Sequence, residues 1–180
     1  MKLKSLILTT AIAALASGVS AEGIKVGMIT TLSGGGAGLG IDVRDGFMLA
    51  IGQSDRSDIE VVIEDDQRKP DVAVQLADKM IQSEKVDVMT GIIWSNLAMA
   101  VVPSVTAQGK FYLSPNAGPS VLAGKGCHKN YFNVAWQNDN LHEAAGAYAK
   151  GIGYKNSFIL APNYPAGQDA LTGYKRMYQG

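Results

Sequence analysis

Short runs of aliphatic and β-branched residues alternate along the chain with longer segments in which apolar residues recur every three or four positions. The short runs predict buried strands, and the longer segments predict amphipathic helices. Predicted strands cover residues 24–31, 59–66, 86–93, 110–114, 131–135 and 156–161. Predicted helices follow residue 40, begin near residues 70, 95 and 140, and end the chain over 167–179. Strands that alternate with helices of about ten to fifteen residues indicate βαβ units, and therefore an α/β fold with a parallel sheet.

Three local signals refine the predicted helices. Ser95 stands where a helix N-cap belongs, because its hydroxyl can accept a hydrogen bond from the first turn. Asn140 and Glu143 have the spacing of a capping box, with Asn as the cap. Pro103 falls inside the helix that follows Ser95, and we expect it to kink or shorten that helix.

The first 21 residues differ from the rest. Lys2 and Lys4 form a basic start, residues 6–16 form an apolar run too short to span a bilayer, and small residues occupy positions 19 and 21. This pattern is typical of a secretory signal peptide with cleavage after Ala21. The alternative is a buried N-terminal helix. The signal peptide predicts an exported protein.

Composition excludes little. The formal net charge is zero, with 47% hydrophobic and 18% charged residues. Removing Lys2 and Lys4 from the 16 basic residues leaves 14 against 16 acidic residues, a net charge of −2. Neither value favours binding to nucleic acid or to an anionic membrane. Cys127 is the only cysteine, so it is free, paired to another chain, or paired to sequence not shown. We favour a packing role and assign the thiol no chemistry.

A glycine cluster at residues 33–40, between a predicted strand and a predicted helix, raises the question of a nucleotide site. The dinucleotide fingerprint needs glycine at its first, third and sixth positions. Counting from Gly34, the sixth position is Leu39, and counting from Gly36 it is Ile41. A P-loop lysine is missing as well. The cluster therefore permits a tight turn, or leaves room for a small ligand at the carboxyl ends of the strands.

Two further loops are predicted at that edge of the sheet, at residues 94–96 and 114–120. Ser95 could offer its hydroxyl and the free N–H groups of its helix to a carboxylate, or act only as an N-cap. Asn116 could bind a ligand or hold its turn. Trp94 could cover an apolar ligand or simply be packed. Tyr164, in a later loop, could close over a ligand from the other side.

No catalytic arrangement is evident. His128 and His142 have no metal-like spacing with each other or with Cys127. A nucleophile elbow is missing. Asp65 and Asp66 are adjacent on a predicted strand, so they should point to opposite faces, and they are expected to form a solvated strand end. We therefore expect neither an enzyme nor a bound metal or cofactor.

Several segments together resemble a known family. They are IKVGMITTLSG, IEDDQRKPDVAVQLADKMI, a strand ending in glycine ahead of WSN, FYLSPNAGPS and ILAPNYPAGQDALTGYKR. In order and spacing, they are similar to the leucine/isoleucine/valine-binding-protein family, the solute-binding components of ABC importers with a type I periplasmic-binding-protein fold. The resemblance implies two α/β lobes joined by a hinge that closes on a ligand.

The resemblance also implies roles for particular residues. Ser95 would contact the ligand's carboxylate, and the segment Asn116, Ala117 and Gly118 would contact its polar end. Leu39, Tyr164 and Ala166 would line the cleft.

Departures from the family pattern bear on the ligand. Amino-acid-binding members commonly carry a hydroxyl residue where Gly118 stands and aromatic residues at Leu39 and Ala166. An ammonium group would lose partners here, so an aromatic acid stacked on Trp94 or Tyr164 rivals a branched-chain amino acid. The disulfide of some relatives would join positions occupied here by Arg68 and Trp94, so it cannot form.

Family members continue well beyond this length. After the signal peptide at 1–21, the resemblance therefore implies a first lobe at 22–136 and a truncated second lobe at 137–180. We expect such an N-terminal fragment to fold poorly alone.

These observations predict a monomeric periplasmic solute-binding protein that captures a small carboxylate and delivers it to a membrane permease. A sensor domain of the same fold that feeds a regulator is one alternative. An exported α/β enzyme is another, disfavoured by the missing catalytic groups.

Overall fold

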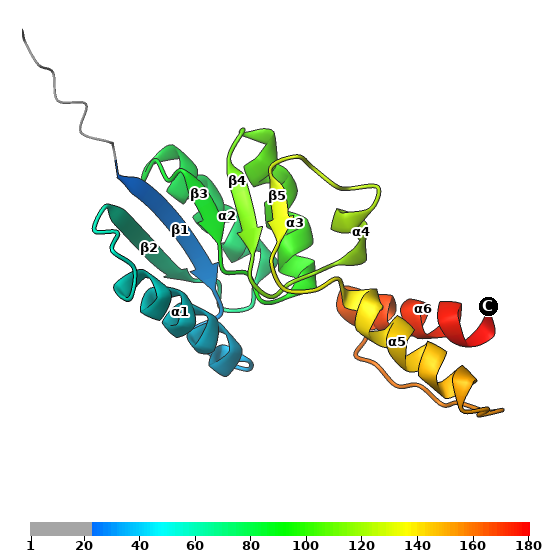
Figure 1. The fold of residues 1–180 in the computed structure, drawn as a ribbon. Helices are drawn as coiled ribbons and strands as arrows, with labels where there is room; N and C mark the ends of the chain where they lie inside the picture. The colour runs from blue at the N-terminus through cyan, green and yellow to red at the C-terminus, as the bar shows by residue number, and fades with distance from the viewer. Residues whose placement is uncertain (1–22) are drawn as a thin grey trace, which may run out of the picture.

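A five-stranded parallel sheet forms the centre of the molecule (Figure 1). The computed structural model describes residues 23–180, so the expected signal peptide lies outside the described residues. The strand order is β2-β1-β3-β4-β5, and every neighbouring pair is parallel. The strands are β1 (Ile24–Thr30), β2 (Ile59–Asp65), β3 (Val88–Thr90), β4 (Phe111–Ser114) and β5 (Tyr131–Asn133). The predicted α/β fold with a parallel sheet is confirmed.

Helices connect the strands and cover the sheet unevenly. They are α1 (Ala37–Gly52), α2 (Pro70–Gln82), α3 (Ser95–Ala107), α4 (Ser120–Ala123), α5 (Asn138–Gly151) and α6 (Pro165–Gln179). Figure 1 shows α1 on one side of the sheet and α2 with α3 on the other. The pair α5 and α6 stands beside the sheet, at the end where the strands point.

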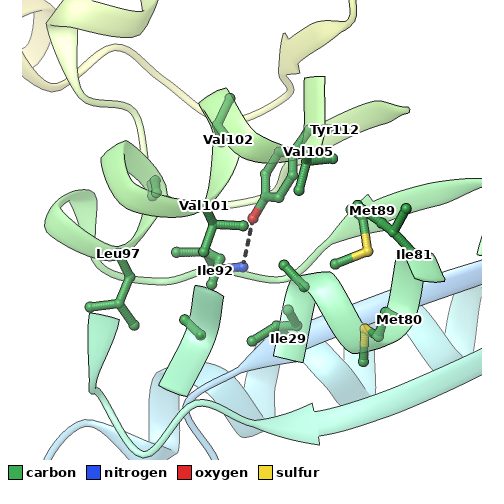
Figure 2. Packing of buried hydrophobic residues seen from close by; sticks show 14 of the residues in the cluster. Ile29, Met80, Ile81, Met89, Ile92, Leu97, Val101, Val102, Val105 and Tyr112 are labelled. Carbon is green, nitrogen blue, oxygen red and sulfur yellow. Dashed lines mark hydrogen bonds between the residues drawn. The ribbon is translucent and has the colours of Figure 1, made fainter. Parts of the chain in front are cut away.

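The core lies between the sheet and the pair α2 and α3. Met80 from α2, Val101 from α3 and Met89 from β3 are fully buried there (Figure 2). Tyr112 crosses this core, and its hydroxyl accepts a hydrogen bond from the Ile92 backbone N–H at 3.2 Å. Burial raises the pKa of Tyr112. The apolar face predicted for α2 therefore packs into this core together with α3.

The opposite face of the sheet stays open over β4 and β5. Tyr112 and Ser114 are buried, whereas the alternating residues Phe111 and Leu113 are exposed, as is Phe132 beside them. Successive strand residues point to opposite faces. The open face is therefore apolar, and no element of the described residues covers it.

The strand predicted at residues 156–161 is wrong, since this segment has no regular structure. Phe158 is 92% exposed and Leu160 is 89% exposed. A strand needs a neighbouring strand to satisfy its backbone hydrogen bonds, and residues 23–180 provide none beside this segment. The apolar run is typical of a buried strand, but it has no neighbouring strand here.

Several helix boundaries also differ from expectation. Ser95 is the first residue of α3 and Trp94 is its N-cap, with no side-chain capping bond. The helix α5 begins at Asn138, so Asn140 lies inside it and no capping box forms. Pro103 lies within α3, which runs unbroken to Ala107. Buried contacts made by Val101 and Val105 hold that helix to the core.

The start of α1 and the end of β2 are likewise different. The helix begins at Ala37, inside the glycine cluster, after Gly36 with a φ of 95°. Asp66 is buried rather than solvated. Its Oδ1 accepts hydrogen bonds from the Thr31 hydroxyl at 2.6 Å and the Arg68 N–H at 2.8 Å. Tight loop packing, which the strand pattern does not encode, buries this carboxyl.

Candidate ligand-binding site

A pocket of ≈ 180 Å³ lies between the carboxyl ends of the strands and the α5–α6 pair. Five residues singled out from the sequence line it together: Ser95, Asn116, Ala117, Tyr164 and Ala166. The sequence had placed them in three separate segments. The parallel sheet brings the first two segments to one edge, and α6 supplies the third.

Ser95 presents a buried hydroxyl at the start of α3, where it is 2% exposed. Hydrogen bonding in the helix begins with the Ala98 N–H, which donates to the Trp94 carbonyl at 2.9 Å. The N–H groups of Ser95, Asn96 and Leu97 donate to no acceptor among the described residues. These groups and the helix dipole favour an anion at this place.

Asn138 links Ser95 to the helices α5 and α6. Its amide nitrogen donates to the Ser95 Oγ and to the Asp169 Oδ2, both at 3.0 Å. The same carboxylate oxygen of Asp169 accepts the Ser120 backbone N–H, also at 3.0 Å. Asn138 is 8% exposed and is the first residue of α5, whereas Asp169 lies on α6. Helices α3, α4, α5 and α6 therefore meet in one polar network beside the pocket.

The loop after β4 forms a second wall. Asn116 donates from its side-chain nitrogen to the Ile93 carbonyl at 3.0 Å, which ties this loop to the one before α3. The Ala117 carbonyl accepts the Ser114 hydroxyl at 2.5 Å. Gly118 lines a neighbouring pocket with Trp136 instead. A Cβ at Gly118 would overlap the Trp136 carbonyl, so this backbone approach requires glycine.

Trp94 lies at the border of the pocket rather than in its lining. Its indole N–H donates to the Thr31 hydroxyl at 2.9 Å, and the Arg68 guanidinium stacks on its ring at 3.9 Å. Tyr164 meets it edge-on, with ring centroids 6.4 Å apart. Leu39 lies on α1, is 49% exposed, and does not line this pocket.

The electrostatics of the pocket suit a neutral or anionic ligand. None of its lining residues is Asp or Glu, and His142 is the only lining side chain able to become a cation. Burial raises the pKa of Tyr164, while the charge of Arg68 acts in the opposite direction. An ammonium group would therefore find no carboxylate in this lining.

Half of the lining comes from residues that no sequence motif singled out. They are Ile93, Trp136, Asn138, Leu141 and His142. Trp136 and Asn138 lie where the chain passes from the sheet to α5, and no sequence motif marks them as binding residues. The sequence indicates no role for His142 beyond the metal-ligand spacing that it lacks. A helix that starts at Asn138 would have placed Asn138, Leu141 and His142 on one face by their spacing.

Asp139, adjacent to Asn138, holds α5 to α6. Its carboxylate accepts the Arg176 guanidinium at 2.6 Å, and Glu143 pairs with the same guanidinium. Burial acts to raise the pKa of Asp139, but hydrogen bonds led by the one from Arg176 outweigh it, so that pKa is lowered. This cluster fixes the position of the wall that carries His142.

Comparison with known proteins places this arrangement in a family. The family model described as periplasmic binding protein matches residues 23–180. The chain belongs to this family. The sequence-based assignment to solute-binding proteins with a type I periplasmic-binding-protein fold is thereby confirmed.

Solved structures of solute-binding proteins are similar to the chain. One from an ABC transporter of R. palustris, in complex with benzoate, is 31% identical, has a TM-score of 0.79, and matches 87% of this chain and 45% of that one. Another, from Rhodopseudomonas palustris BisB5 in complex with 3,4-dihydroxybenzoic acid, is 27% identical with a TM-score of 0.80, over 87% and 44%.

A leucine-binding protein from Thermotoga maritima is similar in fold, with 21% identity, a TM-score of 0.75, and coverage of 87% and 45%. The chain thus spans less than half the length of these relatives. No curated protein matches it. Over residues 23–180, no helix has the length and apolar character that crossing a membrane requires. In the same range, no three His, Cys, Asp or Glu residues gather into a candidate metal site.

Proposed function

We propose that this chain belongs to the solute-binding component of an ABC importer, which captures a small carboxylate in the periplasm and delivers it to a membrane permease. The observation that carries the proposal is the buried Ser95 hydroxyl at the N-terminus of α3, inside a pocket that other loops close. Free backbone N–H groups and a helix dipole stabilise an anion there. In this function the protein binds and releases the ligand without catalysing a reaction.

The ligand we propose is an aromatic carboxylate rather than an amino acid. Trp136 and Tyr164 supply aromatic surface in the lining, and no acidic side chain of the lining is placed to pair with an ammonium group. An unpaired buried cation is costly. The solved relatives at 31% and 27% identity hold benzoate and a dihydroxybenzoate, which supports the same class of ligand.

Export follows from the signal peptide expected at residues 1–21, and the permease partner from the type of system in which the relatives act. We propose that the protein is a monomer and that two lobes close over the ligand. Residues 22–136 would form the first lobe and residues from 137 the second. In this arrangement Ser95, Asn116 and Ala117 come from the first lobe, and Tyr164 and Ala166 from the second.

Isothermal titration of the full-length protein with benzoate, 4-hydroxybenzoate and leucine tests the proposal. We expect an aromatic acid to bind more tightly than leucine. Ser95→Ala should weaken that binding by about ten- to a hundredfold, because a hydrogen bond to a charged group contributes roughly 1.5–3 kcal/mol. Ser104→Ala, further along the same helix, serves as the control. An unchanged dissociation constant for Ser95→Ala would exclude Ser95 from the site.

A further inference from the structure

The network of Asp169, Asn138 and Ser95 has a fixed direction of hydrogen bonding. A carboxylate such as Asp169 only accepts hydrogen bonds. The group that Asn138 turns toward it must therefore be the amide nitrogen, at 3.0 Å from the Asp169 Oδ2. Rotating the amide by half a turn would set two oxygens against each other. Asp169 therefore determines which way the Asn138 amide faces.

The orientation of Asn138 in turn determines what Ser95 can do. The second hydrogen of the same nitrogen points at the Ser95 Oγ, also at 3.0 Å. A serine hydroxyl has one proton to donate and two lone pairs that accept. Because Asn138 already donates to this oxygen, the Ser95 proton is not used between the two residues and can point into the pocket that both line.

We propose that Asp169 and Asn138 are positioning residues that hold the Ser95 hydroxyl as a hydrogen-bond donor toward the ligand. This inference rests on the proposed function, since it assigns the donated proton to the ligand's carboxylate. It gives α6 a part in recognition although Asp169 does not line the pocket. The carboxylate of Asp169 is tied to α4 as well, through the Ser120 N–H at 3.0 Å, which fixes its own position.

The alternative is a purely structural role, in which Asp169 only holds α6 against α3 and α4. Substituting Asp169 would then weaken ligand binding by the same factor whether or not Ser95 is present. A double-mutant cycle separates the two cases, because coupling between residues that act through one another disappears when one of them is removed.

The test measures benzoate affinity by titration in the full-length protein and three variants: Asp169→Asn, Ser95→Ala and the double variant. An asparagine at position 169 has no charge and can turn its nitrogen toward Asn138, at the expense of the hydrogen bond from the Ser120 N–H. The Asn138 oxygen can then turn toward Ser95 and take its proton. We expect Asp169→Asn to weaken benzoate binding about tenfold in the presence of Ser95, and less than about twofold in the Ser95→Ala background.

Asp139→Asn is the matched control. It removes an equal charge from α5, next to Asn138, where the carboxylate contacts Arg176. It should change the free energy of unfolding, and this change should be the same with and without Ser95. Asn138→Ala provides a second variant if Asp169→Asn does not fold. It should also weaken binding only when Ser95 is present, with folding checked by thermal melting.

Equal losses in both backgrounds, or no loss from folded Asp169→Asn and Asn138→Ala proteins, would overturn the inference while leaving the carboxylate site in place. Failure of the folded, unmodified protein to bind benzoate, 4-hydroxybenzoate or leucine would overturn the proposed function, and the inference with it.

Discussion

The guanidinium carbon of Arg68 lies 3.9 Å from the centroid of the Trp94 ring. Gln67 and Arg68 both adopt left-handed backbone conformations, with φ of 52° and 59°. The carboxylate of Asp65 accepts the Gln67 N–H at 2.9 Å, and that of Asp66 accepts the Arg68 N–H at 2.8 Å. Two side-chain oxygens thus hold a strained turn that brings a cation onto the tryptophan at the border of the pocket.

Removing this cation should loosen Trp94. We expect Arg68→Ala to lower the free energy of unfolding by about 0.5–1 kcal/mol, the range for a cation–π contact at an exposed site, and to shift the fluorescence of Trp94. The measurement is made in a Trp136→Phe background. Lys69→Ala removes the same charge one residue away, where the side chain donates a hydrogen bond to Gln67, and should leave the emission unchanged. Identical spectra for all variants would contradict the stacking.

Gly36 should be intolerant of a side chain. Its φ is 95°, and an added Cβ would overlap the Trp94 ring. We expect Gly36→Ala to cost about 1–3 kcal/mol of stability, measured by urea unfolding. Gly38→Ala is the control, because a Cβ there meets nothing within 4 Å. In a helix it should stabilise by roughly 0.5–1 kcal/mol. Similar effects at both glycines would show that the close approach to Trp94 does not matter.

The buried hydroxyl of Tyr112 should contribute to stability through Ile92. Tyr112→Phe leaves the Ile92 N–H, 3.2 Å from that oxygen, without its acceptor. An unsatisfied buried donor costs about 1–3 kcal/mol, so the urea midpoint should fall. Tyr148→Phe, at an exposed position of α5, should stay within about 0.5 kcal/mol of the unmodified protein. Equal midpoints for the two variants would rule out a role for the hydroxyl.

The pKa of Asp66 predicts a pH dependence of stability. Burial raises this pKa above its ordinary value of 3.8, while the hydrogen bond from Thr31 acts against the rise. As pH increases from 3.8 through the higher folded pKa, the folded state binds more protons than the unfolded state, so stability falls. Asp66→Asn removes the titrating group and keeps an acceptor for Thr31.

We therefore expect the stability of Asp66→Asn, relative to the unmodified protein, to rise with pH across that window and to be constant outside it. Thermal melting from pH 3 to pH 7 measures the difference. Asp58→Asn is the control, since hydrogen bonding to Arg56 lowers the pKa of Asp58, and its pH dependence should have the opposite sign. A flat difference for Asp66→Asn would contradict the raised pKa.

The open apolar face should govern how the 180-residue chain behaves alone. Because Phe111, Leu113 and Phe132 are exposed, we expect the chain to bind a hydrophobic dye and to self-associate. Phe132→Lys should reduce dye fluorescence while changing stability by less than about 0.5 kcal/mol. Tyr148→Lys, on α5 outside this face, is the control. Cooperative melting with tight benzoate binding by the chain alone would contradict the expectation.

Local pattern was sufficient for most elements but not for their ends. The strand that begins at Ile24 and the helix that begins at Pro70 could be predicted because each has a clear period and a clear stop signal. Ser95 was expected as an N-cap and is the first helical residue instead. Moving the start of a helix by one residue changes the local energy little. Contacts with neighbouring segments therefore decide where the helix begins.

The segment at residues 156–161 shows that a local sequence pattern alone does not determine whether a strand forms. Its short apolar run is typical of a buried strand, but a strand exists only beside another strand, and none lies next to it in residues 23–180. Asp66 shows the converse. Its sequence context suggested solvent, yet the approach of Thr31 and Arg68 buries it.

The sequence by itself determined the α/β architecture, the edge of the sheet where a ligand would lie, and Ser95, Asn116 and Tyr164 as lining candidates, because periodicity and turn chemistry are local. Ala117 and Ala166 became candidates only through the family resemblance. Tertiary structure alone decided that Asn138 and Asp169 reach Ser95, which lies 43 residues before Asn138. In the tertiary structure, Trp94 and Leu39 do not line this pocket. Contacts between distant segments depend on how helices pack across the sheet, and no single stretch of residues contains that information.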